Sequence, residues 1–116
     1  MRISVFAGPL TVTGSNFTGS TSGGPGGALF DGSQGASVSG STFVGNTSGG
    51  DGGAIDHLGG TLTLTNDTVI INVSNASAGG GGIFKQGGTV ILDRTFVLGN
   101  RPDNCVPLGS VAGCNG

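Results

Sequence analysis

The stretch GGAIDHLGGTLTLTNDTVIIN, residues 52–72, decides the fold of this chain. A glycine pair stands ahead of Ala54 and Ile55, and a second glycine pair precedes a segment, Thr61 to Thr65, in which hydroxyl and apolar side chains alternate strictly. A period of two is the pattern of a β-strand with one buried face. The chain also contains 27 glycines and many serines and threonines, which disfavour helix. The stretch therefore predicts short strands separated by glycine turns.

The same order of residues recurs along the chain in steps of 26, 26 and 28 positions. Four columns share these steps: Leu10, Ala36, Leu62 and Val90; Val12, Val38, Leu64 and Leu92; Phe17, Phe43, Val69 and Val97; Ser20, Asn46, Asn72 and Asn100. A fifth column follows the last two steps: Leu29, Ile55 and Ile83. An internal period between about 20 and 50 residues indicates a stacked-repeat architecture.

A single coil of this length, with two or three short strands, cannot bury its apolar face alone. It can do so by stacking on copies of itself roughly 4.8 Å apart, with every strand paired in parallel. Each column then becomes a row of like side chains inside a tube. The sequence therefore predicts an all-β fold, a parallel β-helix (solenoid) of about four coils, right-handed as parallel crossovers are.

The repeat also predicts how the chain is divided. Residues 1–9 are expected to be the remnant of a preceding coil, and residues 105–116 a C-terminal cap. The β-helix between them is expected to consist of coils at residues 10–25, 26–51, 52–80 and 81–104. The two extra residues of the third coil fall in the loop 73–82, and either a binding loop or a flexible glycine loop fits that position.

The charge of the chain and its first nine residues argue against several classes of function. Only 9% of residues are charged and the net charge is −2. The basic residues are too scattered to bind a nucleic-acid backbone: Arg2, Lys85, Arg94 and Arg101. The apolar run in residues 1–9 is too short for a signal peptide or a membrane span. The first full coil lacks a cap in front of it, so we expect further coils of the same parent chain at the N-terminal end, or a docked partner.

The column of Asn46, Asn72 and Asn100 predicts a structural ladder. Asparagine tolerates turn conformations, and its amide can bond to the coils above and below. Such a ladder satisfies buried turn amides that water cannot reach. The glycosylation-like triplets are expected to be by-products of this column lying beside serine and threonine columns; they begin at Asn16, Asn46, Asn66, Asn72 and Asn75.

Two kinds of segment carry a family resemblance. GGAL (residues 26–29), GGAI (52–55) and FVGN (43–46) resemble the GGA[ILV] and FxxN repeats of polymorphic outer membrane proteins. More widely, residues 10–116 are similar to bacterial right-handed parallel β-helix repeat proteins. The chain departs from the pattern at Ser20 for asparagine, Val69 and Val97 for phenylalanine, and Gly82-Ile83 for GGAI. The resemblance implies a secreted or surface-exposed β-helix with a role in adhesion or display, and does not imply an enzyme.

Cys105 and Cys114 are the two cysteines of the chain, nine positions apart near its C-terminus. We expect a local disulfide that clips a cap over the open end of the tube. Metal binding is the alternative, but two thiols without a nearby histidine make a poor site. The disulfide favours an oxidising, extracytoplasmic location.

Four residues are the candidates for catalysis. The repeat places Asp31, His57 and Lys85 in one column, so Asp31 and His57 should be close enough for the carboxylate to orient the imidazole. Asp56 belongs to the next column, between Phe30 and Phe84. The alternative interpretation is an ordinary solvated ladder at a turn. The chain has no Glu, Tyr or Trp, which weakens the case for an enzyme that cleaves acidic polysaccharides.

Weaker patterns point elsewhere without changing the conclusion. The glycines around Asp51 and Asp56 faintly resemble a calcium-binding nonapeptide, but its nine-residue period is absent. Phe17 and Phe43 fall in the inward column and are expected in the core. The sequence thus predicts a structural or adhesive module without catalytic centre or cofactor, whose partners are glycans or cell-surface proteins; the alternative is a truncated part of a carbohydrate-active β-helix enzyme.

Overall fold

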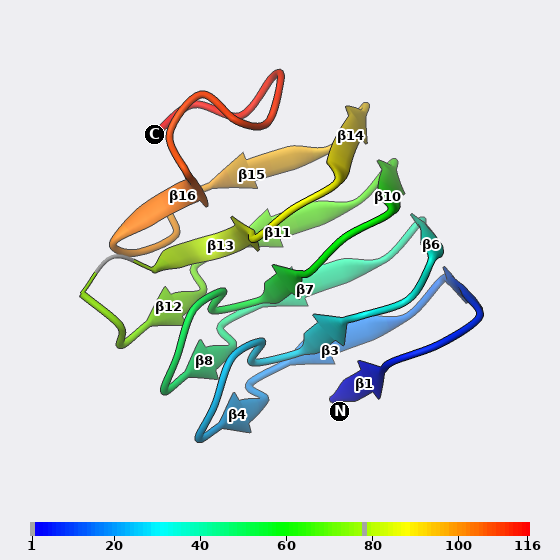
Figure 1. Ribbon diagram of the computed structural model, residues 1–116. Coiled ribbons are helices and arrows are strands. Elements are labelled where there is room, and N and C mark those ends of the chain that lie inside the picture. The colour runs from blue at the N-terminus through cyan, green and yellow to red at the C-terminus, as the bar shows by residue number, and fades with distance from the viewer. Residues whose placement is uncertain (1, 78) are drawn as a thin grey trace.

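The computed structural model describes residues 2–77 and 79–116, and within them the protein is an all-β solenoid without helices. Its coils stack along one axis, so that their strands form four parallel sheets, A to D (Figure 1). Sheet A contains β1 (Ile3–Val5), β5 (Leu29–Asp31), β9 (Ile55–His57), β13 (Gly80–Lys85) and β16 (Asp103–Val106). Sheet B contains β2 (Pro9–Thr13), β6 (Gly35–Ser39), β10 (Thr61–Thr65) and β14 (Thr89–Asp93).

The remaining strands complete each coil. Sheet C contains β3 (Asn16–Thr18), β7 (Thr42–Val44), β11 (Thr68–Ile70) and β15 (Phe96–Leu98). Sheet D contains β4 (Thr21–Ser22), β8 (Thr47–Ser48) and β12 (Val73–Ser74). The first coil therefore runs β1 to β4, the second β5 to β8, the third β9 to β12, and the fourth begins with β13. Residues 1–9, predicted to be a remnant, contain β1, which pairs with β5 as the first strand of the first coil.

The strand register confirms the predicted repeat. Val12 pairs with Val38, Val38 with Leu64, and Leu64 with Leu92, all in parallel. The steps of 26, 26 and 28 residues are therefore the lengths of chain that return to the same place on the tube. Because side chains alternate between the two faces of a strand, a constant register keeps the apolar residues inside in every coil.

The core is the interior of the tube. Leu29, Leu62, Leu64 and Val69 are fully buried, and the first two phenylalanines of the sheet C column stack with centroids 4.6 Å apart and an interplanar angle of 1°. Those two residues, Phe17 and Phe43, are also fully buried, so the prediction that they are core residues is confirmed. Burial of like side chains in rows is what holds consecutive coils together.

The extra residues of the third coil lie before β13. Val73 pairs with Thr47 at a separation of 26, whereas Ile83 pairs with Ile55 at a separation of 28. The register thus changes within the predicted loop 73–82, of which residue 78 lies outside the described residues.

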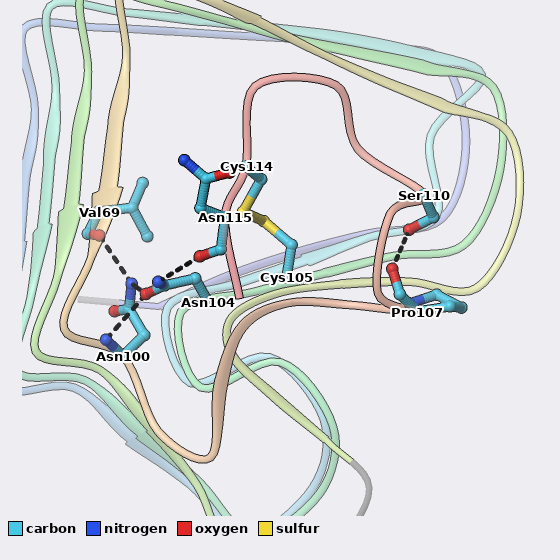
Figure 2. Close-up of a disulfide and its surroundings, with 8 residues drawn as sticks. All are labelled: Val69, Asn100, Asn104, Cys105, Pro107, Ser110, Cys114 and Asn115. Atoms are coloured by element: carbon cyan, nitrogen blue, oxygen red, sulfur yellow. Dashed lines mark hydrogen bonds between the residues drawn. A yellow bond between two sulfur atoms is a disulfide. The ribbon is translucent and has the colours of Figure 1, made fainter.

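The C-terminal segment lies across the end of the tube beyond β16 (Figure 1). Cys105 and Cys114 form the predicted disulfide, with an S–S distance of 2.01 Å (Figure 2). Between them, Val111 is 2% exposed and belongs to the hydrophobic core. At the opposite end, β1 to β4 are the edge strands of their sheets.

Candidate functional site

Asp31 and His57 are neighbours, as predicted, and both lie inside a corner of the tube. They are register partners on β5 and β9, and Asp31 Oδ2 lies 2.8 Å from His57 Nδ1. Both side chains are fully buried, because each lies two positions after an inward residue, Leu29 or Ile55, and therefore shares its face of the strand. The alternative of a solvated ladder is wrong for these two residues. Lys85, the next residue of the column, is half-buried on β13.

The Asp31 carboxylate has partners on both oxygens. Oδ1 accepts hydrogen bonds from the Ser33 backbone N–H at 3.0 Å and from the Ser33 hydroxyl at 2.5 Å. Burial alone would raise the pKa of Asp31, but the hydrogen bonds from His57 and Ser33 outweigh it and hold this pKa below its ordinary value. Asp31 is therefore an ionised, fully paired carboxylate.

His57 is held from both sides. Its Nδ1 faces Asp31 of the preceding coil, and its Nε2 lies 3.1 Å from the carbonyl oxygen of Gly60 in the following turn. The ring thus ties the second coil, the third coil and the turn after β9 together. A general base needs a ring nitrogen within reach of substrate, and both nitrogens of His57 are already engaged. The pair is arranged as a structural clasp.

Asp56 does not join this clasp. It lies on the outward face of β9, in the column between Phe30 and Phe84. The exposed Gln86 side chain covers it, and Gln86 Nε2 donates to both carboxylate oxygens, at 2.9 and 3.0 Å. Burial raises the pKa of Asp56 to about 6, although the Gln86 hydrogen bonds act in the opposite direction. The four predicted candidates are therefore divided between two faces of one sheet.

Ser33 and Gln86 were not anticipated from the sequence. Ser33 follows Asp31 by two positions, which is the spacing at which an aspartate oxygen accepts the N–H of a turn, so the pattern of residues contained this signal. Gln86 reaches Asp56 from the next coil, and its side-chain direction has no signature in the repeat. No group of three His, Cys, Asp or Glu side chains suited to a metal ion occurs in the part of the chain that the structure describes.

The asparagine ladder has the predicted geometry. Asn72 Oδ1 accepts hydrogen bonds from the backbone N–H and the Nδ2 of Asn46, both at 2.9 Å, and Asn100 Oδ1 does the same for Asn72. Each Nδ2 also donates to a backbone carbonyl of the preceding coil, such as that of Phe43 for Asn72. Because Asn46 and Asn72 are fully buried, their glycosylation-like triplets are inaccessible in the folded chain.

Asn104 completes the ladder from outside the repeat. Its Oδ1 accepts the backbone N–H and the Nδ2 of Asn100, at 3.0 and 2.9 Å, in the place that the next coil would supply (Figure 2). Its own Nδ2 donates to the carbonyl of Asn115 at 2.7 Å, beside the disulfide. The C-terminal segment thus satisfies the last step of the ladder. This role of Asn104 has no signal in the repeat, because Asn104 is only four residues from Asn100 and does not follow the period.

The outward face of sheet B carries rows of hydroxyl groups. Leu10 and Val12 point inward, so the residues between and after them point outward in each coil. The hydroxyl residues of this face are Thr11, Thr13, Ser37, Ser39, Thr61, Thr63, Thr65 and Thr89. Each is exposed or half-buried. No pocket occurs on the described surface. In the fourth coil the hydroxyl row continues as Ile91, which is exposed.

Comparison of the chain with protein-family models, with curated proteins and with solved structures found no match. Nor do the described residues include a helix long and apolar enough to cross a membrane.

Proposed function

We propose that this chain is a non-catalytic structural or adhesive β-helix module, secreted or displayed on a bacterial cell surface, that binds or presents itself to glycan or protein partners. The engaged state of His57 carries the proposal, because the one carboxylate–imidazole pair of the candidate set is buried and both ring nitrogens face protein oxygens. The disulfide supports an oxidising, extracytoplasmic location. The resemblance to polymorphic outer membrane protein repeats points to the same role.

The proposed contact surface is the hydroxyl-rich outward face of sheet B. Its rows of threonine and serine present hydrogen-bonding groups at the spacing of the strands, on a scaffold whose register is fixed in every coil. The edge strands β1 to β4 are the proposed stacking surface for further coils of the parent chain.

The second candidate function is a truncated part of a carbohydrate-active β-helix enzyme. Asp56 is the observation that favours it, because an outward carboxyl group with a pKa of about 6 is the kind of group that acid catalysis uses. In this reading, Asp56 would be reached by displacement of Gln86.

A glycan array combined with a polygalacturonate-cleavage assay separates the two functions. We expect binding without turnover, abolished by Thr63→Arg in the middle of the sheet B face. Thr18→Arg, at an exposed outward position of sheet C, is the matched control and should bind like the unsubstituted chain. Cleavage that disappears in Asp56→Asn or His57→Ala, with circular dichroism unchanged, would favour the enzyme instead.

A further inference from the structure

A second polar row runs through the turn between sheets B and C. Its members occupy the same place in successive coils: Ser15, Ser41, Asp67 and Thr95. From the second member onward, a side-chain oxygen accepts the backbone N–H of the row member before it. The distances are 3.0 Å for Ser15 to Ser41, 2.7 Å for Ser41 to Asp67 and 3.2 Å for Asp67 to Thr95. Asp67 is the one carboxyl group in a row of hydroxyls.

The hydroxyls of the row also act as donors. Ser15 and Ser41 donate to the carbonyl two residues earlier, at 2.9 and 3.1 Å. The Thr95 hydroxyl lies 3.2 Å from the corresponding carbonyl, that of Asp93, and 2.9 Å from the Leu64 carbonyl. A hydroxyl can accept one hydrogen bond and donate another, whereas an ionised carboxylate can only accept. The corresponding carbonyl for Asp67 belongs to Thr65. It accepts the Gly40 N–H at 3.0 Å, just as the Ser39 carbonyl accepts the Gly14 N–H at 2.9 Å in the coil before.

Asp67 is buried with only one of its two carboxyl oxygens hydrogen-bonded. Its side chain is 1% exposed, and its Oδ2 is the only buried side-chain N or O atom without a hydrogen-bond partner in the described residues. The preceding turn, residues 39–41, contributes no titratable group. The following turn contributes Asp93 and Arg94, which are exposed and paired with each other at 3.2 Å. Burial raises the pKa of Asp67 to about 6, and the backbone N–H groups of Ser41 and Thr65 only partly oppose it.

We propose that the Asp67 carboxyl group is protonated in the folded chain and donates a hydrogen bond to the Thr65 carbonyl. The solenoid is then most stable in mild acid and loosens at this turn when the proton leaves. Protonation makes Asp67 equivalent to the hydroxyls above and below it, with one acceptor and one donor. Because the pKa is raised in the folded state, the stabilisation is complete below about pH 4 and is lost as the pH rises through about 6. This property goes beyond the adhesive role and does not depend on it.

The test is a set of urea unfolding curves from pH 4 to pH 8 for the full chain and for Asp67→Asn and Asp67→Ser. Asparagine supplies an oxygen for the Ser41 N–H and an N–H for the Thr65 carbonyl without titrating, and serine restores the hydroxyl of the other coils. The difference between each variant and the unsubstituted chain should grow between pH 4 and pH 7, by up to roughly 100-fold in the folding equilibrium constant. Asp93→Asn is the control, because it removes an exposed carboxylate from the following turn.

Carboxyl carbon NMR of the unsubstituted chain decides the question even if a variant fails to fold. A titration of Asp67 centred well above pH 5 supports the proposal. A titration at or below pH 4, or a pH profile of stability that Asp67→Asn leaves unchanged, overturns it.

Discussion

Asp31 and Asp56 lie on neighbouring strands of sheet A and are both fully buried, yet their pKa values move in opposite directions. Asp31 faces the inside of the tube and is bonded by a histidine ring, a hydroxyl and a backbone N–H. Asp56 faces outward and has one neutral amide, that of Gln86. Burial penalises both carboxylates, so the number and kind of hydrogen-bond donors decides which one stays ionised.

The two aspartates also differ in what they do for the fold. The corner of Asp31 and His57 joins consecutive coils, and removing either partner leaves a buried polar group without its bond. At Asp56, the only side-chain hydrogen bonds to another coil are those from Gln86. We therefore expect substitutions at the first position to damage the fold and substitutions at the second to change its dependence on pH.

The largest effect is expected for Asp31→Ala. It leaves His57 Nδ1 and the Ser33 hydroxyl and N–H without their acceptor in a buried corner. Removal of one partner of a buried pair typically costs about 3–5 kcal/mol, and we expect a loss of that size in the free energy of unfolding measured in urea at pH 7. Asp93→Ala, which removes an exposed carboxylate, is the control and should change stability by less than about 0.5 kcal/mol. A loss for Asp31→Ala no greater than that of this control would remove the distinction between the two regions.

A smaller effect of opposite sign is expected for Asp56→Asn. Because the pKa of Asp56 is raised to about 6, the folded chain loses stability as the pH rises from about 4 through 6. The neutral amide of asparagine avoids this loss, so the variant should be more stable than the unsubstituted chain by about 2 kcal/mol at pH 7.5 and equal to it at pH 4. Thermal or urea unfolding at the two pH values measures the difference. A variant that is less stable than the parent at pH 7.5 would mean that the charged form of Asp56 is favoured in the fold.

At low pH, the stability of the chain is expected to depend on Asp31. Its pKa is lowered in the folded state, so its stabilisation is present above the ordinary pKa of aspartate and is lost as the pH falls through the lowered value. Asp31→Asn should therefore differ most from the unsubstituted chain at neutral pH and converge toward it below about pH 3. Urea unfolding at pH 7 and pH 2.5 gives both values. A constant difference at both pH values would show that the carboxylate charge does not contribute.

The smallest effect is expected for Gln86→Ala. Its amide is exposed on one side but supplies both hydrogen bonds to Asp56, so removing it should raise the pKa of Asp56 further and destabilise the chain by about 1 kcal/mol at pH 7. A carboxyl NMR titration measures the pKa change directly. Gln34→Ala, an exposed glutamine in the turn after β5, serves as the control. An unchanged titration of Asp56 would mean that the Gln86 amide does not favour its charged form.

The repeat contains most of what is needed to place residues next to each other. Once coils of 26 and 28 residues stack in register, Asp31 must lie beside His57 and Asn46 beside Asn72, and the structure confirms both pairs. The inward direction of Asp31 also follows from its two-residue spacing from Leu29, although the solvated alternative overlooked it. What the repeat leaves out are contacts made by residues that break it, such as Asn104 and Gln86.

Chain length per coil and the alternation of apolar residues are therefore sufficient to establish the solenoid, its register and its interior rows, because parallel stacking admits only one alignment of like with like. The protonation of the three buried aspartates is a different matter. Asp31, Asp56 and Asp67 are chemically identical in the sequence, and each acquires its character from the donors that the folded neighbours bring within hydrogen-bond distance. Groups brought close by folding, several of them from another coil, set the free energy of a buried charge, and these neighbours are in place only after the coils have stacked.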